Sequence, residues 1–381
     1  MSFHSKLNNV AVSIFTEMSM LANQHGAINL SQGFPEFDTP ELLKSTVNEF
    51  IASGKNQYAP SIGTPELLAQ VEQLIHRQYA MPLNPGQSVT ITSGATEALW
   101  CAIQTLVTSG DEVIVFDPAY DSYEPAVALA GGRCIHIPML APDYKIDWQQ
   151  VEEVITNKTK AIIINSPHNP TGTLLTEQDM QTVEKLVWEN DLYLISDEVY
   201  EFITFDGRQH ESVLRFPKLF ERSLVVSSFG KTFHCTGWKL GYCTAPPELT
   251  DEFRKIHQYV TFASFTPAQL GIAKMLQQEP SHITELAGFY QSKRDCLVNA
   301  LQDSRFKLLN SQGTYFLLVD YSEISQKSDR DFCHWLTKEK GVAAIPLSPF
   351  YENQTSDKIV RLCFAKNENT LLNAAEKLCQ L

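Results

Sequence analysis

The stretch Ser223-Leu-Val-Val-Ser-Ser-Phe-Gly-Lys-Thr232 joins a short apolar run to a glycine and a lysine, and it decides the fold. The apolar run predicts a buried strand that ends just before Lys231. Hydroxyl groups precede this lysine, and a second cation, Lys239, follows eight residues later. Such a set suits a cofactor with an aldehyde and a phosphate, because the amine can form a Schiff base while neighbouring donors hold the phosphate. For a lone lysine, however, a solvated surface position is the commoner case.

The end of this stretch, Gly230-Lys231-Thr232, also imitates a nucleotide-binding P-loop. That motif requires an earlier glycine at a fixed offset, so that backbone amides can wrap the β-phosphate. Val225 occupies the required position and belongs to the apolar run. The sequence therefore disfavours an ATPase or a kinase.

Five short apolar runs in the middle of the chain predict buried strands of a largely parallel sheet. Between several of them lie helical patterns, such as the apolar residues that recur on one face after Thr96. This alternation predicts an α/β fold with helices on both faces of the sheet. The runs are Ser88–Thr92, Glu112–Phe116, Ala161–Asn165, Leu192–Ser196 and Leu224–Ser227.

The C-terminal part of the chain has a different pattern, which predicts a smaller α+β domain. A long helix is expected around residues 285–301, with strands near 307–309, 315–319 and 359–363. A length of 381 residues also favours more than one domain. We expect residues 45–280 to form a large cofactor-binding domain with a mixed, mostly parallel sheet. Residues 1–44 and 281–381 are expected to form the small domain.

The composition excludes several classes of partner. A formal net charge of −14 argues against nucleic acid or an anionic membrane, because those surfaces are themselves polyanionic. Apolar runs stay shorter than a membrane span, and the segment Met1–Lys6 lacks the apolar core of a signal peptide, so we expect a cytoplasmic protein. The eight cysteines and ten histidines show no spacing typical of a metal site, and we expect no bound metal.

Polar residues just past the apolar runs are the candidates for a site, since ligands of open parallel sheets gather at the carboxyl ends of strands. Gly94-Ala95-Thr96 opens a helix whose N–H groups can bind a phosphate, although a plain turn capped by Thr96 explains it equally well. Asp197 needs a cationic or N–H partner, such as a protonated pyridine nitrogen, unless it is simply a helix cap. Asn169, in a turn rich in proline and glycine, and Tyr200 can both bond a phenolic oxygen.

This ordered set of motifs resembles the fold type I, class I aminotransferases that use pyridoxal 5'-phosphate. Four stretches carry the likeness with compatible spacing, and Arg361 adds a fifth position. Two further stretches, Asn29–Pro35 and Phe116–Tyr123, are similar to the branch of methionine aminotransferases and glutamine/kynurenine aminotransferases. The four stretches are Thr92-Ser-Gly-Ala-Thr-Glu-Ala98, Asn165-Ser-Pro-His-Asn-Pro-Thr-Gly172, Ser196-Asp-Glu-Val-Tyr200 and Ser227-Ser-Phe-Gly-Lys231.

The resemblance implies a role toward the cofactor for each matching residue. Lys231 would form the Schiff base and carry the proton between the substrate and the cofactor, while Asp197 would pair with the pyridine nitrogen. Tyr120 would stack on the ring, and Asn169 and Tyr200 would hold its oxygen. The bond between Asn169 and Pro170 would be cis. The phosphate would be bound by Ala95, Thr96, Ser228 and Lys239, and by Tyr58 from a partner subunit.

The resemblance also implies the substrate contacts. Arg361 would clamp the α-carboxylate as a fork, beside the backbone of Gly33 and the amide of Asn169. Lys239 stands where many relatives carry arginine, which keeps the charge but loses the bidentate geometry. Aromatic side chains would offer an apolar wall suited to a thioether or a ring, although the core is the commoner place for phenylalanine. The aromatics named for this wall are Phe15, Phe34, Tyr120, Tyr123 and Phe262.

These matches imply a homodimeric transaminase with shared active sites, acting on bulky apolar or aromatic α-amino acids and a 2-oxo acid. Methionine is the leading donor, followed by phenylalanine, glutamine, histidine and kynurenine-like compounds. A carbon–sulfur β- or γ-lyase on the same fold is the nearest alternative, because the same carbanion can expel a leaving group. A non-catalytic regulator is the other alternative, and the intact set of Lys231, Asp197 and Arg361 counts against it.

Overall fold

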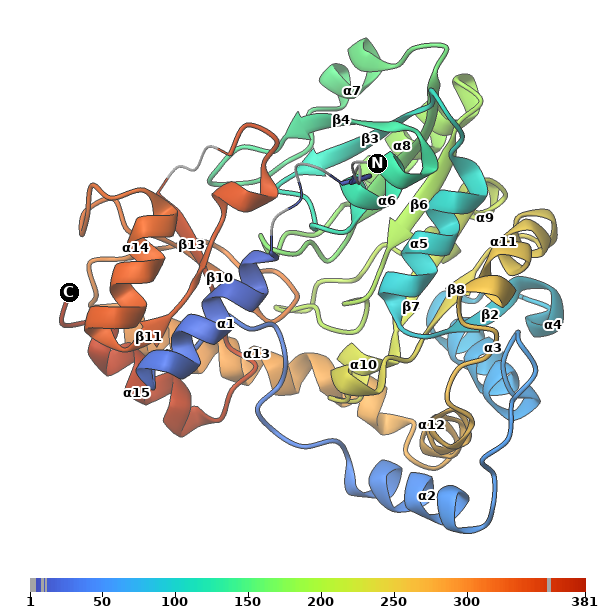
Figure 1. Cartoon of the computed structure of the whole chain (residues 1–381), viewed down its shortest axis with the longest axis horizontal. Coiled ribbons are helices and arrows are strands. Elements are labelled where there is room, and N and C mark those ends of the chain that lie inside the picture. Colours follow the sequence, from blue (N-terminus) through green and yellow to red (C-terminus); the bar gives the residue numbers. More distant parts are fainter. Residues whose placement is uncertain (1–4, 8–9, 11, 355–357) are drawn as a thin grey trace, which may run out of the picture.

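A seven-stranded sheet is the largest element of the computed structural model, which describes residues 5–7, 10, 12–354 and 358–381 (Figure 1). Strand β8 runs antiparallel to β2 and β7, whereas the other neighbouring pairs are parallel. The expected α/β fold with a mixed, mostly parallel sheet is therefore confirmed. In spatial order the strands are β2 (Val89–Thr92), β8 (Gly241–Thr244), β7 (Ser223–Ser228), β6 (Tyr193–Asp197), β5 (Thr159–Asn165), β3 (Glu112–Asp117) and β4 (Arg133–Pro138).

Five of these strands coincide with the predicted apolar runs, and two do not. Strand β4 lies at the edge of the sheet and carries polar residues such as Arg133 and His136, so it does not read as an apolar run. Strand β8 is buried but has only four residues and begins with Gly241. Both segments form strands because of pairing with their neighbours in the sheet rather than because of their own composition. The sequence pattern therefore misses them.

The sheet is covered by helices on both faces, as expected. Adjacent residues of a strand point to opposite faces, and Val113 and Ile114 accordingly belong to different hydrophobic clusters. The cluster of Val113 includes α5 (Ala95–Leu106), α6 (Tyr123–Ala130) and α11 (Pro247–Val260). The cluster of Ile114 includes the helices α3 (Pro65–Tyr79), α8 (Glu177–Glu189), α9 (Pro217–Phe220) and α12 (Thr266–Gln278).

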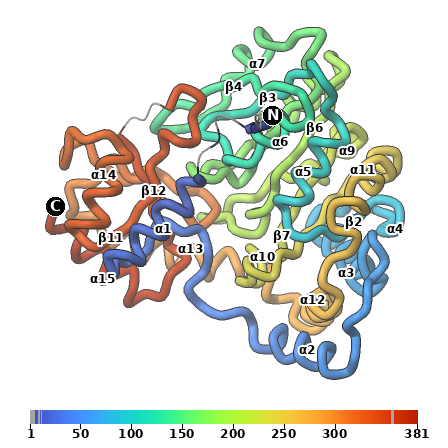
Figure 2. Tube along the Cα trace, in the orientation of Figure 1, coloured from blue at the N-terminus to red at the C-terminus, as the bar shows by residue number. Residues whose placement is uncertain are grey.

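A second, smaller group of elements lies beside the sheet (Figure 1). Its four-stranded sheet is antiparallel, and Arg361 lies on β13 between Leu318 of β10 and Ile345 of β12. Strands β1 (Ile28–Asn29) and β11 (Val342–Ala343) pair in parallel and lie next to α1 (Figure 2). The four strands, in order, are β12 (Ile345–Pro346), β13 (Ile359–Cys363), β10 (Phe316–Asp320) and β9 (Lys307–Leu308).

The remaining helices connect or flank these two groups. Helix α13 begins at Ser281, four residues before the start expected from the sequence, and ends at Leu301 as expected. Within the described residues, no helix combines the length and apolar character needed to cross a lipid bilayer. The other helices are α1 (Ile14–His25), α2 (Glu41–Ala52), α4 (Pro85–Ser88), α7 (Trp148–Val154), α10 (Phe229–Thr232), α14 (Asp329–Trp335) and α15 (Glu368–Leu378).

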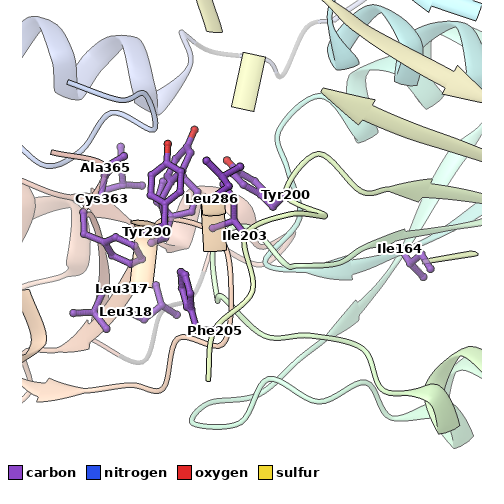
Figure 3. Close-up of a cluster of buried hydrophobic side chains, with 14 of the residues drawn as sticks. Ile164, Tyr200, Ile203, Phe205, Leu286, Tyr290, Leu317, Leu318, Cys363 and Ala365 are labelled. Atoms are coloured by element: carbon purple, nitrogen blue, oxygen red, sulfur yellow. The ribbon is translucent and has the colours of Figure 1, made fainter. Parts of the chain in front are cut away.

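Buried aromatic residues join the two groups of elements. Figure 3 shows Tyr200 and Ile203, from the loop after β6, near Leu286 and Tyr290 of α13. The rings of Tyr200 and Tyr315 meet edge to face, with centroids 5.1 Å apart. The loop that follows the large sheet is therefore packed directly against the small one.

A buried ion pair fixes the start of α5. The Glu97 carboxylate lies 2.8 Å from Nδ1 of His257 on α11, and Nε2 of His257 lies 2.8 Å from the Ser61 carbonyl oxygen. Burial alone would lower the pKa of His257, but the Glu97 carboxylate raises it above its usual value. The thiol of Cys101 also donates to Glu97. These contacts hold the first turn of α5 against α11 and the loop at Ser61.

Candidate active site

Residues at the carboxyl ends of several strands of the large sheet line one cavity of about 170 Å³. They come from β5, β6 and β7, from the turn that joins β2 to α5, and from the loop around Tyr120. The cavity brings together most of the predicted site residues. These are Ala95, Thr96, Tyr120, Asn169, Asp197, Tyr200, Ser228, Lys231 and Lys239.

Asp197 ends β6 and is buried at one side of this cavity. One carboxylate oxygen accepts the hydroxyl proton of Tyr123 at 2.6 Å, and the other accepts a long bond of 3.4 Å from the Val199 amide. Burial raises the pKa of Asp197 to about 6, although the Tyr123 hydroxyl lowers it. None of the ion pairs in the described part of the chain involves Asp197. A buried carboxylate of this kind can pair with a cationic ligand.

The opposite end of the cavity is formed by the first turn of α5, which presents backbone N–H groups. Gly94 precedes the helix with φ of 83°, and in the described structure no side chain caps this end. Nζ of Lys239 lies 3.4 Å from the Thr96 hydroxyl, so a cation stands at the positive end of the helix dipole. Gly241 lets the turn approach closely, because a Cβ there would lie 3.1 Å from the Ala95 nitrogen and 2.6 Å from the Ser227 carbonyl oxygen. The turn is built to receive an anion.

Lys231 follows β7, and its amine is hydrogen-bonded by residues from outside the large sheet. Its Nζ donates to the Tyr315 hydroxyl at 2.8 Å and to the Gly33 carbonyl oxygen at 3.4 Å. Burial lowers the pKa of Lys231 to about 8. About a tenth of the amine is therefore neutral at pH 7, far more than for an ordinary lysine, and only the neutral form can act as a nucleophile or a base.

Arg361 lies next to the cavity, in the centre of the small sheet. Its guanidinium donates to the Asn169 side-chain oxygen at 2.7 Å and to the Ser31 carbonyl oxygen at 3.0 Å. It is only 1% exposed, and its Nε is buried without a hydrogen-bond partner among the described residues. Burial also lowers its pKa. The side-chain oxygen of Asn169 and the carbonyl oxygen of Ser31 are both neutral acceptors. The positive charge of Arg361 is therefore not neutralised, and it can still bind a carboxylate.

Two aromatic rings lie close to this guanidinium. The carbon of the guanidinium lies 3.8 Å from the centroid of Phe316 and 5.2 Å from that of Phe15. Gly33 leaves room for the Phe316 ring, because a Cβ at this position would lie only 2.8 Å from its Cζ atom. The glycine therefore allows residues 31–33 to pass between Lys231 and Arg361. The bond between Asn169 and Pro170 is cis, as the resemblance implied.

Tyr123 lies in a different place from the one expected. It was predicted in the apolar wall for the substrate, but its buried hydroxyl bonds Asp197 and its side chain does not line the cavity. Tyr123 is the first residue of α6, and from there its hydroxyl reaches the carboxylate at the end of β6. Tyr123 therefore supports Asp197.

Other predicted residues also lie outside the lining of the cavity, namely Gly33, Phe34, Arg361, Phe15, Tyr58 and Phe262. Phe15 contacts Arg361, as described above, and packs on Phe350 with centroids 5.5 Å apart. Tyr58 and Phe262 form an edge-to-face pair on the surface, with 83% and 52% of each residue exposed. Within a single chain these two rings do not reach the cavity.

Tyr315 is the contact residue that sequence reasoning missed. It precedes β10 in the apolar stretch Tyr315–Val319, which reads as a core strand. A tyrosine in such a stretch gives no local signal of its partner, because Lys231 comes from a distant part of the chain. Only the packing of the two groups of elements brings the two side chains together.

Comparisons with known proteins agree with this geometry. The family model for aminotransferase class I and II matches residues 25–378. Methionine aminotransferase of Escherichia coli K12 is 51% identical over 377 residues, which cover 99% of this chain and 98% of the relative. Human kynurenine–oxoglutarate transaminase 1 is 31% identical, covering 98% and 96% of the two chains.

A solved structure extends the comparison to the fold. The crystal structure of an Escherichia coli protein with a methionine aminotransferase function superposes with a TM-score of 0.98 at 50% identity, and the match covers 100% of both chains. A match over nearly the whole length, with the lysine, the aspartate and the arginine around one cavity, leaves the family in no doubt. The chain belongs to the class I and II aminotransferases.

Proposed function

We propose that this chain binds pyridoxal 5'-phosphate and transfers the α-amino group of bulky apolar or aromatic amino acids to a 2-oxo acid. One observation carries the proposal: two opposite charges are buried at the cavity, Asp197 in its lining and Arg361 hydrogen-bonded to Asn169, which also lines it. Neither takes part in an ion pair within the described residues. Buried charges of this kind are expensive unless a ligand pairs with them.

The residues around the cavity fit this cofactor. The N–H groups of Ala95 and Thr96, with Ser228 and Lys239, would hold its phosphate, and Asp197 would hold its ring nitrogen. Tyr120 would lie on the ring, while Asn169 and Tyr200 would bond its hydroxyl oxygen. When bound, the cofactor supplies a ring that withdraws the negative charge formed at the substrate's α-carbon.

Lys231 is proposed to do the proton transfer. Its Nζ would take the proton from the substrate's α-carbon, and a pKa of about 8 suits both the acceptance and the return of that proton. The two acceptors at Tyr315 and Gly33 hold the amine in place meanwhile. The side chain of Lys231 therefore supports a cycle in which one group serves as base and then as acid.

Arg361 is proposed to select the α-carboxylate of the substrate. Its buried Nε and the nearby rings of Phe15 and Phe316 leave a fork for a single carboxylate in an aromatic setting. The segment Tyr259–Pro267, which we propose borders the partner's pocket, contains no second cation. Apolar donors are therefore favoured over dicarboxylic ones, and the relative named as methionine aminotransferase supports methionine as the leading donor.

We also propose a homodimer with shared sites. Tyr58 and Phe262 belong to a group of exposed apolar residues that includes Tyr259, Val260 and Phe265. An exposed aromatic group on one surface is typical of a protein interface. In a dimer, Tyr58 would bind the partner's phosphate and Phe262 would border the partner's substrate.

We also propose that the chain folds as two domains. The sequence predicts a larger, cofactor-binding domain at residues 45–280 and a smaller one at residues 1–44 and 281–381. Helix α2 (Glu41–Ala52) packs on α12 and belongs with the larger domain, so we place the first boundary before Glu41. The cytoplasmic location stays a prediction.

Replacement of Lys231 tests the cofactor assignment. Lys231→Ala should fold normally but lose turnover by at least about 10²–10⁴-fold, the range for loss of a general acid–base group. Borohydride reduction of the wild-type holoenzyme should attach the cofactor to the peptide that contains Lys231, as read by mass spectrometry. Lys255→Ala, which removes an exposed lysine on α11, is the matched control and should label normally. A label on any other lysine would contradict the assignment.

Subunit mixing tests the shared site. Lys231→Ala and Tyr58→Ala should each be impaired, but heterodimers of the two should regain activity, because one site then has both an intact lysine and the partner's intact tyrosine. Mixtures of Lys231→Ala with Asp197→Asn should stay inactive, since every site carries one defect. If Lys231→Ala and Tyr58→Ala also fail to complement after verified subunit exchange, Tyr58 serves its own chain.

Substrate preference tests the role of Arg361. We expect kcat/KM for methionine or phenylalanine to exceed that for aspartate by about 100-fold or more, because a second buried carboxylate without a cation costs several kcal/mol. Product analysis should find an oxo acid with the intact side chain. Release of the side-chain thiol instead would favour the β- or γ-lyase. A preference for aspartate would mean that another cation enters the pocket.

A further inference from the structure

Tyr315 occupies a position between the reactive lysine and the loop that passes Arg361. Its hydroxyl accepts from Nζ of Lys231 at 2.8 Å and donates to the Gly33 carbonyl oxygen at 2.5 Å. The residue is fully buried, and its ring packs edge to face on Tyr200. Two residues earlier than Gly33, the Ser31 carbonyl oxygen accepts from Arg361. Residues 31–33 therefore contact Lys231, Tyr315 and Arg361 in one short segment.

The direction of these hydrogen bonds follows from the number of protons. A phenol has one proton to donate, and that of Tyr315 is engaged by Gly33. Burial raises the pKa of Tyr315 well above its usual value, so the hydroxyl keeps this proton. Its oxygen can then only accept from Lys231. The hydroxyl is thus a fixed acceptor for the amine.

A neutral amine has two N–H bonds and one lone pair. In Lys231 the first N–H points to Tyr315 and the second to the Gly33 carbonyl oxygen, 3.4 Å away. Lys231 lines the cavity, whereas Gly33 and Tyr315 are absent from the lining found for it among the described residues. The lone pair is therefore left on the cavity side, where it faces the position of a bound ligand.

We propose that Tyr315 is a positioning residue for transamination: together with the Gly33 carbonyl it engages both N–H bonds of the Lys231 amine and aims the lone pair of that amine into the cavity. The inference rests on the proposed function, because it assigns Lys231 as the reacting amine. It also links the two ends of the substrate site. The Ser31 carbonyl, in the segment that positions Lys231, accepts a hydrogen bond from Arg361. A carboxylate that binds Arg361 therefore acts on the same segment.

The proposal is tested first on the cofactor-free full chain with cyanate. The neutral amine adds to the carbon of isocyanic acid, one amine proton moves to the nitrogen, and a urea forms. The rate at Lys231, read from the mass of its peptide as a function of pH, should have a midpoint near pH 8 in the wild type. Tyr315→Phe should lower this midpoint by about one pH unit or more, because the ammonium form loses an acceptor.

Tyr290→Phe is the matched control. Tyr290 is also fully buried, and its ring lies 5.6 Å from that of Tyr315, as part of the cluster in Figure 3. Its hydroxyl has no hydrogen-bond partner within the described residues. Removal of this hydroxyl should therefore leave the midpoint at the wild-type value. A Tyr315→Phe midpoint equal to that of Tyr290→Phe would overturn the proposal.

A second measurement uses the holoenzyme. In single turnovers with methionine, Tyr315→Phe should slow transfer of the α-proton by about 10–100-fold, since a misplaced reacting group costs about that much. The isotope effect with α-deuterated methionine should rise at the same time. Tyr290→Phe should change neither quantity. An unchanged rate and isotope effect in Tyr315→Phe would also overturn the proposal.

Failure of this inference can be told apart from failure of the proposed function. If borohydride still labels Lys231 in Tyr315→Phe while both the midpoint and the isotope effect match the wild type, the transaminase stands and the role of Tyr315 is wrong. If Lys231 is not labelled even in the wild type, the proposed function itself is wrong. Should Tyr315→Phe not fold, Tyr315→difluorotyrosine keeps the hydroxyl but weakens its oxygen as an acceptor, and it should shift the midpoint in the same direction.

Discussion

Two opposite charges, on Asp197 and Arg361, are buried with no ion-pair partner among the described residues, and they are the constraint on which the rest of the site depends. Burial of an unpaired charge is unfavourable, and a protein that only had to be stable would replace both with neutral residues. Here each charge is held by neutral groups: the hydroxyl of Tyr123 for the carboxylate, and the amide of Asn169 with a carbonyl for the guanidinium. Neutral partners keep both charges in place and leave them able to bind a ligand.

The fold explains how these charges can face one cavity. Parallel strands of the large sheet bring their carboxyl ends to one edge, where Asp197, Asn165 and Ser228 end three neighbouring strands. The antiparallel small sheet supplies Arg361 from its centre, and the aromatic cluster around Tyr200 and Tyr315 holds the two groups of elements together. Lys231 stands at their junction, which is why its amine is bonded by Tyr315, just before β10 of the small sheet, and by the loop at Gly33.

Much of this could be predicted from the sequence, because local patterns carry it. The five apolar runs located five strands of the large sheet, and the residues just past them line the cavity. What the sequence could not supply is contact between distant segments. The sequence pattern places Tyr123 among the aromatics of the pocket, whereas its hydroxyl bonds Asp197, and it places Tyr315 in the core, whereas its hydroxyl bonds Lys231. Strands β4 and β8 were missed since their place in the sheet comes from their neighbours.

The most direct test is the thermal stability of Asp197→Asn at pH 8, without and with added pyridoxal 5'-phosphate. The pKa of Asp197 is raised to about 6 from 3.8, so its ionisation weakens the fold as the pH rises through that range, by about 3 kcal/mol once complete. If the charge is held for a ligand, the cofactor-free variant should unfold at the wild-type temperature or above it, and the cofactor should stabilise it far less than the wild type. A cofactor-free variant that unfolds well below the wild type, yet gains as much from the cofactor, would show that Asp197 is a structural residue.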